Sequence, residues 1–139
     1  MELYGVNLVG VLVAAVVGML FGFIWYSPKV FGVKWMKLAG ISKRKAKEAK
    51  EKGMFLNMLG GFIGQIVTAA VLSVFLLYAG AGSIAASLVV AFLLWLGFTA
   101  TTQIGLVLWE QKPWGLFALN GLYSLCNLLI MAIVLQLLA

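Results

Sequence analysis

The sequence predicts an all-α fold, an integral membrane four-helix bundle with a short amphipathic interfacial helix and a basic cytoplasmic helix between spans one and two. Three observations predict it. First, 64% of the 139 residues are hydrophobic and 10% are charged, whereas ordinary globular domains carry about 25% charged residues. Second, four apolar runs each reach the ~20 residues that a membrane helix needs. Third, the basic residues are concentrated in one link between two of these runs.

The four apolar runs cover residues 3–26, 54–78, 84–108 and 114–138. Together they take up most of the chain, so we expect a single membrane domain over residues 1–139. The first run is long enough to span the bilayer, and Glu2 stands where a secretory signal would carry positive charge. We therefore expect the first run to be a retained helix.

The basic residues predict the topology. Nine of the ten Lys and Arg residues lie between Lys29 and Lys52, and the tenth is Lys112. An even number of crossings separates these two links, and the link between runs two and three is uncharged. Because short basic loops stay cytoplasmic, we expect the loop 27–53 and Lys112 to be cytoplasmic, with both termini outside.

The first half of the basic loop has the pattern of a helix lying in the membrane interface. Ser27 and Pro28 are typical of an N-cap and a first helical turn. Over residues 29–39, apolar side chains recur at i, i+4 and i+7, opposite the lysines. Aromatic side chains favour the headgroup region. The predicted interfacial anchors are Trp25, Tyr26, Phe31 and Trp35.

The second half of the loop is mostly lysine and glutamate. Gly40 ends the first helix, and Ser42 is suited to cap a second one. In that second helix Glu48 precedes Lys52 by four residues, the favourable order for an ion pair. We expect this helix to project into water and its lysines to attract anionic lipid. Nucleic acid is not expected as a partner, because no aromatic residues interleave with the lysines.

Neutral polar residues inside the spans form a candidate ligand or packing site. Because an amide that faces lipid leaves donors and acceptors unpaired, we expect these side chains to point inward. Their spacing on the fourth run, i, i+4 and i+7, places three of them on one face. The predicted cluster is Asn57, Gln65, Thr102, Gln103, Asn120, Ser124 and Asn127. If the amides pair directly, their role is structural. If they do not, water or a small ligand completes the hydrogen bonds.

Glycine pairs at i, i+4 predict close helix crossings, because small residues let membrane helices approach each other. The predicted packing glycines are Gly18, Gly22, Gly60 and Gly64. A four-helix bundle of 15.0 kDa has a large surface for its volume. We therefore expect a homo-oligomer, a dimer or a trimer, with one of these pairs at a crossing.

Few residues are suited to catalysis. The chain has no histidine, a single cysteine (Cys126) and no charged residue inside any span. We therefore predict no catalytic residue, metal site or cofactor. Glu110, at the cytoplasmic edge, is the only acid near the bilayer apart from Glu2. The favoured function is a non-enzymatic homo-oligomeric module that binds or passes a small molecule or lipid. A membrane enzyme that uses Glu110 or a tyrosine is the alternative, and a holin-like pore-former is a more distant one.

Two sequence elements carry a family resemblance. The first is Asn7, a glycine-rich span, Trp25-Tyr26-Ser27-Pro28, Phe31-Gly32 and Trp35, and the second runs from Trp95 through Glu110 to Asn120-Gly-Leu-Tyr123. With these elements the chain resembles the bacterial family called domain of unknown function 1761, over nearly its whole length. The resemblance implies a small four-span protein of the bacterial inner membrane. It implies no activity, substrate or catalytic residue.

Overall fold

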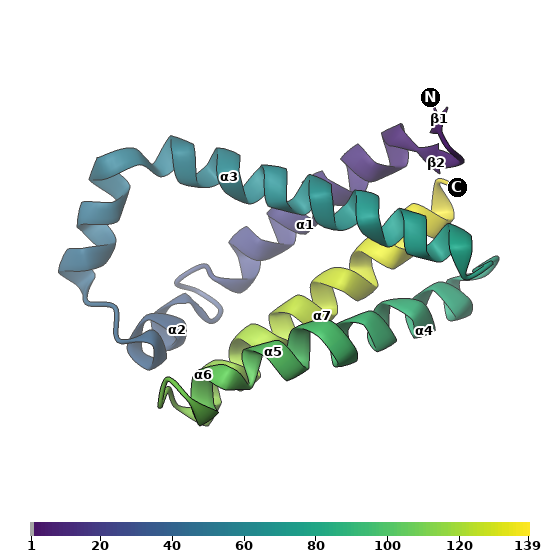
Figure 1. Cartoon of the computed structure of the whole chain (residues 1–139). Helices are drawn as coiled ribbons and strands as arrows, with labels where there is room; N and C mark the ends of the chain where they lie inside the picture. The colour runs from purple at the N-terminus through teal and green to yellow at the C-terminus, as the bar shows by residue number, and fades with distance from the viewer. Residues whose placement is uncertain (1) are drawn as a thin grey trace.

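The computed structural model describes residues 2–139, most of which are helical (Figure 1). Four stretches are long and apolar enough to cross a membrane: Leu8–Trp25, Lys43–Tyr78, Ile84–Leu108 and Trp114–Leu137. The predicted all-α fold with four long apolar helices is therefore confirmed. The structure differs from the sequence predictions at three of these stretches. A hairpin precedes the first, a bend interrupts the helix of the second, and the third is irregular in its second half.

A small hairpin precedes the first span, whereas the apolar run predicted helix from residue 3. Strand β1 (Glu2–Leu3) pairs antiparallel with β2 (Val6–Asn7). The two residues between them, Tyr4 and Gly5, have φ values of 51° and 83°. Positive φ at both central residues matches the twist of a tight hairpin turn. This turn keeps the first residues of the apolar run out of the helix.

Helix α1 (Leu8–Trp25) begins directly after the hairpin and is capped by Asn7. The Asn7 Oδ1 atom accepts hydrogen bonds from two backbone N–H groups of the first turn, at 3.1 and 3.3 Å. Its Nδ2 atom donates to the carbonyl oxygen of Leu138. One asparagine therefore caps α1 and also joins the start of the described chain to its end.

The interfacial helix α2 (Gly32–Ala39) begins later than predicted. The prediction that Ser27 and Pro28 start it is wrong. The Ser27 hydroxyl instead donates to a carbonyl in the last turn of α1, at 2.8 Å, and the following residues form turns. Gly32 lies directly against the backbone of this turn, where a Cβ would collide with the carbonyl oxygen of Tyr26. This close contact positions α2 beside the end of α1.

Helix α3 (Lys43–Tyr78) contains both the basic helix and the second span. Gly40, with φ 74°, ends α2, and the Ser42 hydroxyl accepts a hydrogen bond from the Lys45 N–H, as its predicted capping role requires. Within α3, Gly53 has φ 147°, far from helical geometry. The basic turns therefore meet the spanning part at a sharp bend (Figure 1).

The ion pair in the basic part of α3 is not the predicted one. Arg44 Nε lies 3.3 Å from Glu48 Oε1, also at a spacing of i, i+4, and no Glu48–Lys52 pair forms. Arg44 is N-terminal to Glu48, and both side chains are well exposed. Such an exposed pair adds little to stability.

The third span is helical over its predicted length but irregular in its second half. It consists of α4 (Ile84–Leu94), the π-helix η1 (Trp95–Ala100), α5 (Thr101–Gln103) and α6 (Gly105–Leu108). π-Helical segments are rare in proteins, and those that do occur are often found at functional sites. Here the segment lies next to the polar residues described below.

Helix α7 (Trp114–Leu137) packs between α1 and α4, while α1 also packs against α3. In contrast, α3 and α4 touch in few places. The bundle is therefore open between α3 and α4. Its core is made mainly of small and aliphatic side chains from the four spans and from strand β2: Val6, Val11, Ala14, Ala69, Leu72, Leu76, Ala91, Met131, Ala132 and Leu135.

The two ends of the bundle differ in composition. Both chain ends and the uncharged α3–α4 link lie at one end (Figure 1). Helix α2 and the α6–α7 link, which carry basic residues, lie at the other end. All ten Lys and Arg residues thus belong to the links at one end of the bundle or to the basic turns that follow them.

Candidate functional site

The candidate site lies where α1, α3 and α7 meet around Gly18. Two amide oxygens, Gln65 Oε1 and Asn127 Oδ1, lie 2.7 and 2.9 Å from the position that a Cβ on Gly18 would take. The Met131 methyl carbon lies 2.8 Å from the same position. A side chain would overlap all three groups, so the site requires glycine. The absence of a side chain at Gly18 leaves room for both amide oxygens beside α1.

The amides of α3 and α7 pair directly. Asn127 Nδ2 donates to Gln65 Oε1 at 3.1 Å, and Gln65 Nε2 donates to the Tyr123 hydroxyl at 3.2 Å. Asn127 is buried, with 7% of its surface exposed. Its Oδ1 has no hydrogen-bond partner among the described residues and faces Gly18. The pairing is therefore direct between the two amides but leaves one buried acceptor unpaired.

Two tyrosines extend this network toward the α2 end of the bundle. The Tyr26 hydroxyl donates to Asn120 Oδ1 at 2.8 Å, which connects the end of α1 to α7. The Tyr123 ring stacks on Phe21, with centroids 5.6 Å apart and planes 7° apart, and lies 5.0 Å from the Tyr26 ring. Asn120, Tyr123 and Asn127 thus line the face of α7 that is turned toward α1 and α3.

The predicted interfacial anchors all contact other aromatic rings. Trp25 and Phe31 lie 4.6 Å apart between ring centroids, and Tyr26 and Trp35 lie 5.5 Å apart with an edge-to-face geometry. Trp25 Nε1 is buried and has no partner among the described residues. These contacts hold α2 against the end of α1.

The Ser124 hydroxyl bonds to η1 and not to the amide pair, although Ser124 lines the cavity that reaches Gln65 and Asn127. The indole N–H of Trp95 lies 3.0 Å from both the Gly121 carbonyl oxygen and the Ser124 hydroxyl oxygen. The Ser124 hydroxyl also donates to the Gly121 carbonyl, at 2.9 Å. These contacts join the π-helix to α7. Asn120, Ser124 and Asn127, predicted to share one face, therefore bond to three different neighbours: the end of α1, η1 and α3, respectively.

Four other predicted residues do not join the network. Asn57 is exposed on α3 and makes no side-chain hydrogen bond in the described chain. Thr102 is exposed, and its hydroxyl donates to the Phe98 carbonyl of the preceding π-helix η1, at 2.7 Å. Gln103 lies beside Gly121, with its Oε1 buried and unpaired among residues 2–139. Glu110 is exposed and forms no ion pair with any of residues 2–139.

The four predicted packing glycines separate into two pairs. Gly18 contacts the amides, and a Cβ on Gly22 would lie 3.0 Å from the Tyr123 hydroxyl oxygen. These two glycines therefore serve packing within the chain. At Gly60 and Gly64, a Cβ would meet no packed atom of residues 2–139 within 4 Å, apart from the neighbouring turns of the same helix.

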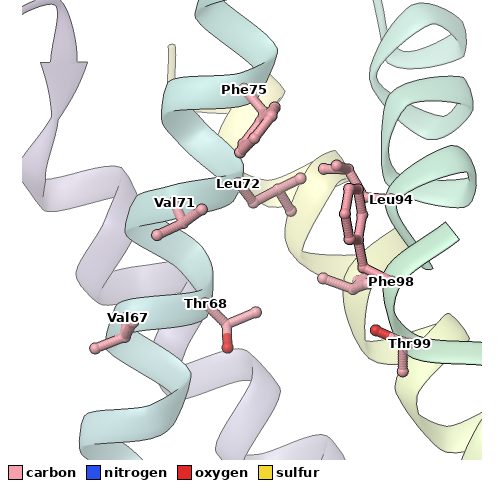
Figure 2. A pocket seen from close by; sticks show the side chains of 9 residues that line it. Val67, Thr68, Val71, Leu72, Phe75, Leu94, Phe98 and Thr99 are labelled. Carbon is pink, nitrogen blue, oxygen red and sulfur yellow. The ribbon is translucent and has the colours of Figure 1, made fainter. Parts of the chain in front are cut away.

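A groove runs along the open side of the bundle, between α3 and the α4–η1 segment. Its volume is about 430 Å³, and Figure 2 shows side chains of α3 on one wall and of α4–η1 on the other. An adjoining cavity of about 290 Å³ reaches Gln65, Tyr123 and Asn127. The groove and the cavity share three lining residues, Thr68, Thr99 and Leu128. The apolar groove therefore adjoins the cavity at the polar network.

Sequence reasoning missed several polar contacts. It assigned Tyr26 to the interface and gave Tyr123 no role, although both hydroxyls belong to the network. It also missed Ser87, fully buried, whose hydroxyl donates to Gln136 Oε1 at 2.9 Å. Ser87 and Gln136 are polar residues within apolar runs, the same signal that identified Asn127.

Four apolar helices and a neutral polar network define a multi-pass helical membrane protein. The chain belongs to the family described as protein of unknown function (DUF1761), whose model matches residues 9–136. This match confirms the resemblance seen in the sequence, and it includes the whole polar network. Comparison with curated proteins and with solved structures finds no match.

Proposed function

We propose that this protein is a non-enzymatic membrane module that binds a neutral amphiphile, a lipid or a lipid-like small molecule, in the groove between α3 and α4. The observation that carries this proposal is that an apolar groove adjoins a cavity lined by a hydrogen-bonding network, with three lining residues in common. An amphiphile has the same two parts, an apolar tail and a polar head.

The chemistry of the lining favours a neutral head group. The tail region is aliphatic and aromatic, including Val71, Phe75 and Phe98. The polar end offers hydroxyls and amides, and neither the groove nor the cavity is lined by a charged residue. A charged head group there would lose its hydration without a counter-charge, at a large cost. Hydroxyl or amide heads can replace water with the available donors and acceptors.

The groove is accessible from the side of the bundle. Phe98 is 73% exposed, and Val67 and Phe75 are about half exposed. In a bilayer these side chains face the acyl chains, so a ligand reaches the groove laterally, without crossing water. This access favours a ligand that already partitions into the membrane.

Photolabelling tests the proposal. The purified protein is reconstituted in phosphatidylcholine vesicles with a long-chain alcohol that carries a diazirine in its tail, and the adducts are mapped by mass spectrometry. We expect adducts concentrated on the groove walls. Thr99→Phe fills the groove and should reduce them severalfold. The matched control is Val89→Phe on α4, because Val89 is exposed and does not line the groove.

Two outcomes would contradict the proposal. Adducts spread evenly over lipid-facing positions such as Val89 and Leu93 would show only dissolution of the probe in the bilayer. Labelling of the groove that is equally strong in Thr99→Phe and Val89→Phe would show that the probe does not occupy the space beside Thr99. Circular dichroism of each variant checks that the helices remain folded.

We also propose an orientation, with both termini outside and α2, the basic turns of α3 and the α6–α7 link in the cytoplasm of a bacterial cell. The support is the position of all ten Lys and Arg residues in the links at one end of the bundle and the turns that follow them. Cytoplasmic loops of inner-membrane proteins carry such an excess of Lys and Arg.

Finally, we propose that the module is a homo-oligomer, a dimer or a trimer, that associates through Gly60 and Gly64 on α3. The support is that a Cβ built on either glycine would meet no packed atom of the described residues within 4 Å. Gly18 and Gly22 are occupied within the chain and are not available for this contact. Small residues at i, i+4 allow two membrane helices to approach closely.

A further inference from the structure

A second cavity, separate from the α3–α4 groove, lies between α2 and the basic turns of α3. Its volume is about 580 Å³, larger than that of the groove. Most of its lining is apolar, including Val33, Met36, Ile41 and Met54. Because the apolar side chains that line it are costly to expose to water, we expect an apolar group of another molecule to occupy this cavity.

The backbone holds this cavity open. Gly40 ends α2 with φ 74°, and Gly53 bends α3 with φ 147°. These two glycines bound the segment that follows α2, and residues of α2 and of the basic turns at 43–52 line the cavity as its two walls. Ser42 caps the second wall by accepting the Lys45 N–H at 3.1 Å. The opposite wall is held by the contact between the rings of Tyr26 and Trp35.

Two lysines, Lys45 and Lys50, line the same cavity. Helical spacing places Ala46 and Ala49 with them on the face of α3 turned toward α2. Among residues 2–139 the ion pair joins Arg44 to Glu48, so neither Lys45 nor Lys50 has an acidic partner. Two unpaired ammonium groups therefore border an apolar cavity.

Two residues that line the cavity are of the types that favour the depth of lipid head groups. It is lined by Tyr26, the residue that follows the last turn of α1, and by Trp35 of α2. Tyrosine and tryptophan side chains favour the boundary between head groups and acyl chains. The segment between Lys29 and Lys52 carries nine basic residues against two acidic ones, Glu48 and Glu51. The local charge is thus complementary to an anionic head group.

We propose that this cavity is a binding site for one anionic phospholipid of the surrounding leaflet. Part of an acyl chain occupies the space between Met36, Ile41 and Ala49, and the phosphate lies between the ammonium groups of Lys45 and Lys50. This site is independent of the neutral-amphiphile groove, because the two share no lining residue. The lysines contribute charge, and the apolar walls select a lipid over a soluble phosphate.

Native mass spectrometry of the full chain tests the proposal. The protein is released from nanodiscs that contain phosphatidylcholine with a minor fraction of phosphatidylglycerol, and the retained lipid is counted. We expect one phosphatidylglycerol to be retained selectively. Lys45→Gln with Lys50→Gln should lower this retention about tenfold, since each lysine near an anionic lipid contributes substantially. The matched control, Lys43→Gln with Lys47→Gln, removes the same charge outside the cavity and should retain the lipid.

Each other outcome overturns a stated part of the proposal. Equal loss in the two double variants would show diffuse attraction to the whole basic segment. Unchanged retention in both would show that neither lysine pair holds the lipid. Two further measurements test the apolar walls. Glycerol phosphate, a soluble phosphate, should not displace the lipid, and Ala49→Phe, which keeps the charge, should reduce its retention. Displacement by glycerol phosphate, or full retention in Ala49→Phe, would show that the acyl chain does not occupy the cavity.

Discussion

Asn127 on α7 donates a hydrogen bond to Gln65 on α3 across 3.1 Å, and both amide oxygens face Gly18 on α1. One pair of side chains therefore joins three of the four spans. This contact also lies at the polar end of the groove in which we propose that a ligand binds. Its energetics can be tested without knowing the ligand.

Removing either amide should destabilise the bundle modestly. Hydrogen bonds between membrane helices contribute ~0.6 kcal/mol on average, so we expect Gln65→Leu, which removes two, to cost ~1–2 kcal/mol. A double-mutant cycle with Asn127→Leu, measured by unfolding in mild detergent, should give a coupling energy of ~0.6 kcal/mol. Asn57→Leu is the control, because Asn57 is exposed and unpaired in the described chain. A coupling energy of zero would contradict the pairing.

Gly18→Ala should destabilise the protein more than Gly60→Ala. A methyl group at Gly18 would overlap two amide oxygens and the Met131 methyl group, and overpacking of this kind costs ~1–3 kcal/mol. At Gly60 a methyl group meets nothing within 4 Å, so the same change should leave the fold unaffected. Thermal unfolding of the two variants in one detergent makes the comparison. Equal stability would show that α1, α3 and α7 do not converge at Gly18.

Tyr26→Phe should weaken the attachment of α1 to α7. It removes the donor to Asn120 Oδ1 while keeping the ring that contacts Trp35 and Tyr123. We expect a loss of ~0.5–1.5 kcal/mol, the usual net value of one hydrogen bond, seen as a lower melting temperature. Tyr78→Phe is the matched control, because Tyr78 is 84% exposed. Equal effects of the two changes would contradict the hydrogen bond.

A fusion of alkaline phosphatase to the C-terminus should be active in a bacterial host, because that enzyme folds in the periplasm and our proposed topology puts the C-terminus outside. Changing Lys43, Lys45, Lys47 and Lys50 to Glu should produce mixed orientations, since it removes much of the positive charge that keeps the loop inside. A C-terminal green fluorescent protein that fluoresces strongly would reverse the assignment.

Gly60→Leu combined with Gly64→Leu should convert the proposed oligomer to monomer without unfolding it. The leucines hold two α3 helices apart, and the Cβ position of each glycine has open space around it among the described residues. Mass measurement in mild detergent, over a range of protein concentrations, reports the change. Leucine at Gly97, which also has an open Cβ position, serves as the control. A wild-type chain that is monomeric at every concentration would end this proposal.

The spans could be predicted because their signal is additive over about 20 residues and survives local irregularity. The hairpin could not be predicted from hydropathy, because Leu3, Tyr4 and Val6 are apolar and suit a helix equally well. Only the glycine at position 5 indicates the turn, through its tolerance of positive φ. The π-helix at Trp95–Ala100 likewise leaves the hydropathy unchanged.

The polar network was only partly accessible to sequence reasoning. The spacing of Asn120, Ser124 and Asn127 gives a common face about 60° wide, and several neighbouring helices can share such a face. Contacts with different helices then separate Ser124 from the two asparagines. The Tyr26 ring suits the interface while its hydroxyl bonds inward, and residue type alone does not reveal the second role.

The bend at Gly53 also bears on how this family can vary in length. In an unbroken helix, inserting one residue rotates everything on one side by about 100° relative to the other side. At Gly53 the helical geometry is interrupted, so a change in the number of residues in the basic segment is not transmitted as rotation of the span. Insertions and deletions before Gly53 should therefore leave Gln65 facing Asn127, and the basic segment can change length while the intramembrane site keeps its register.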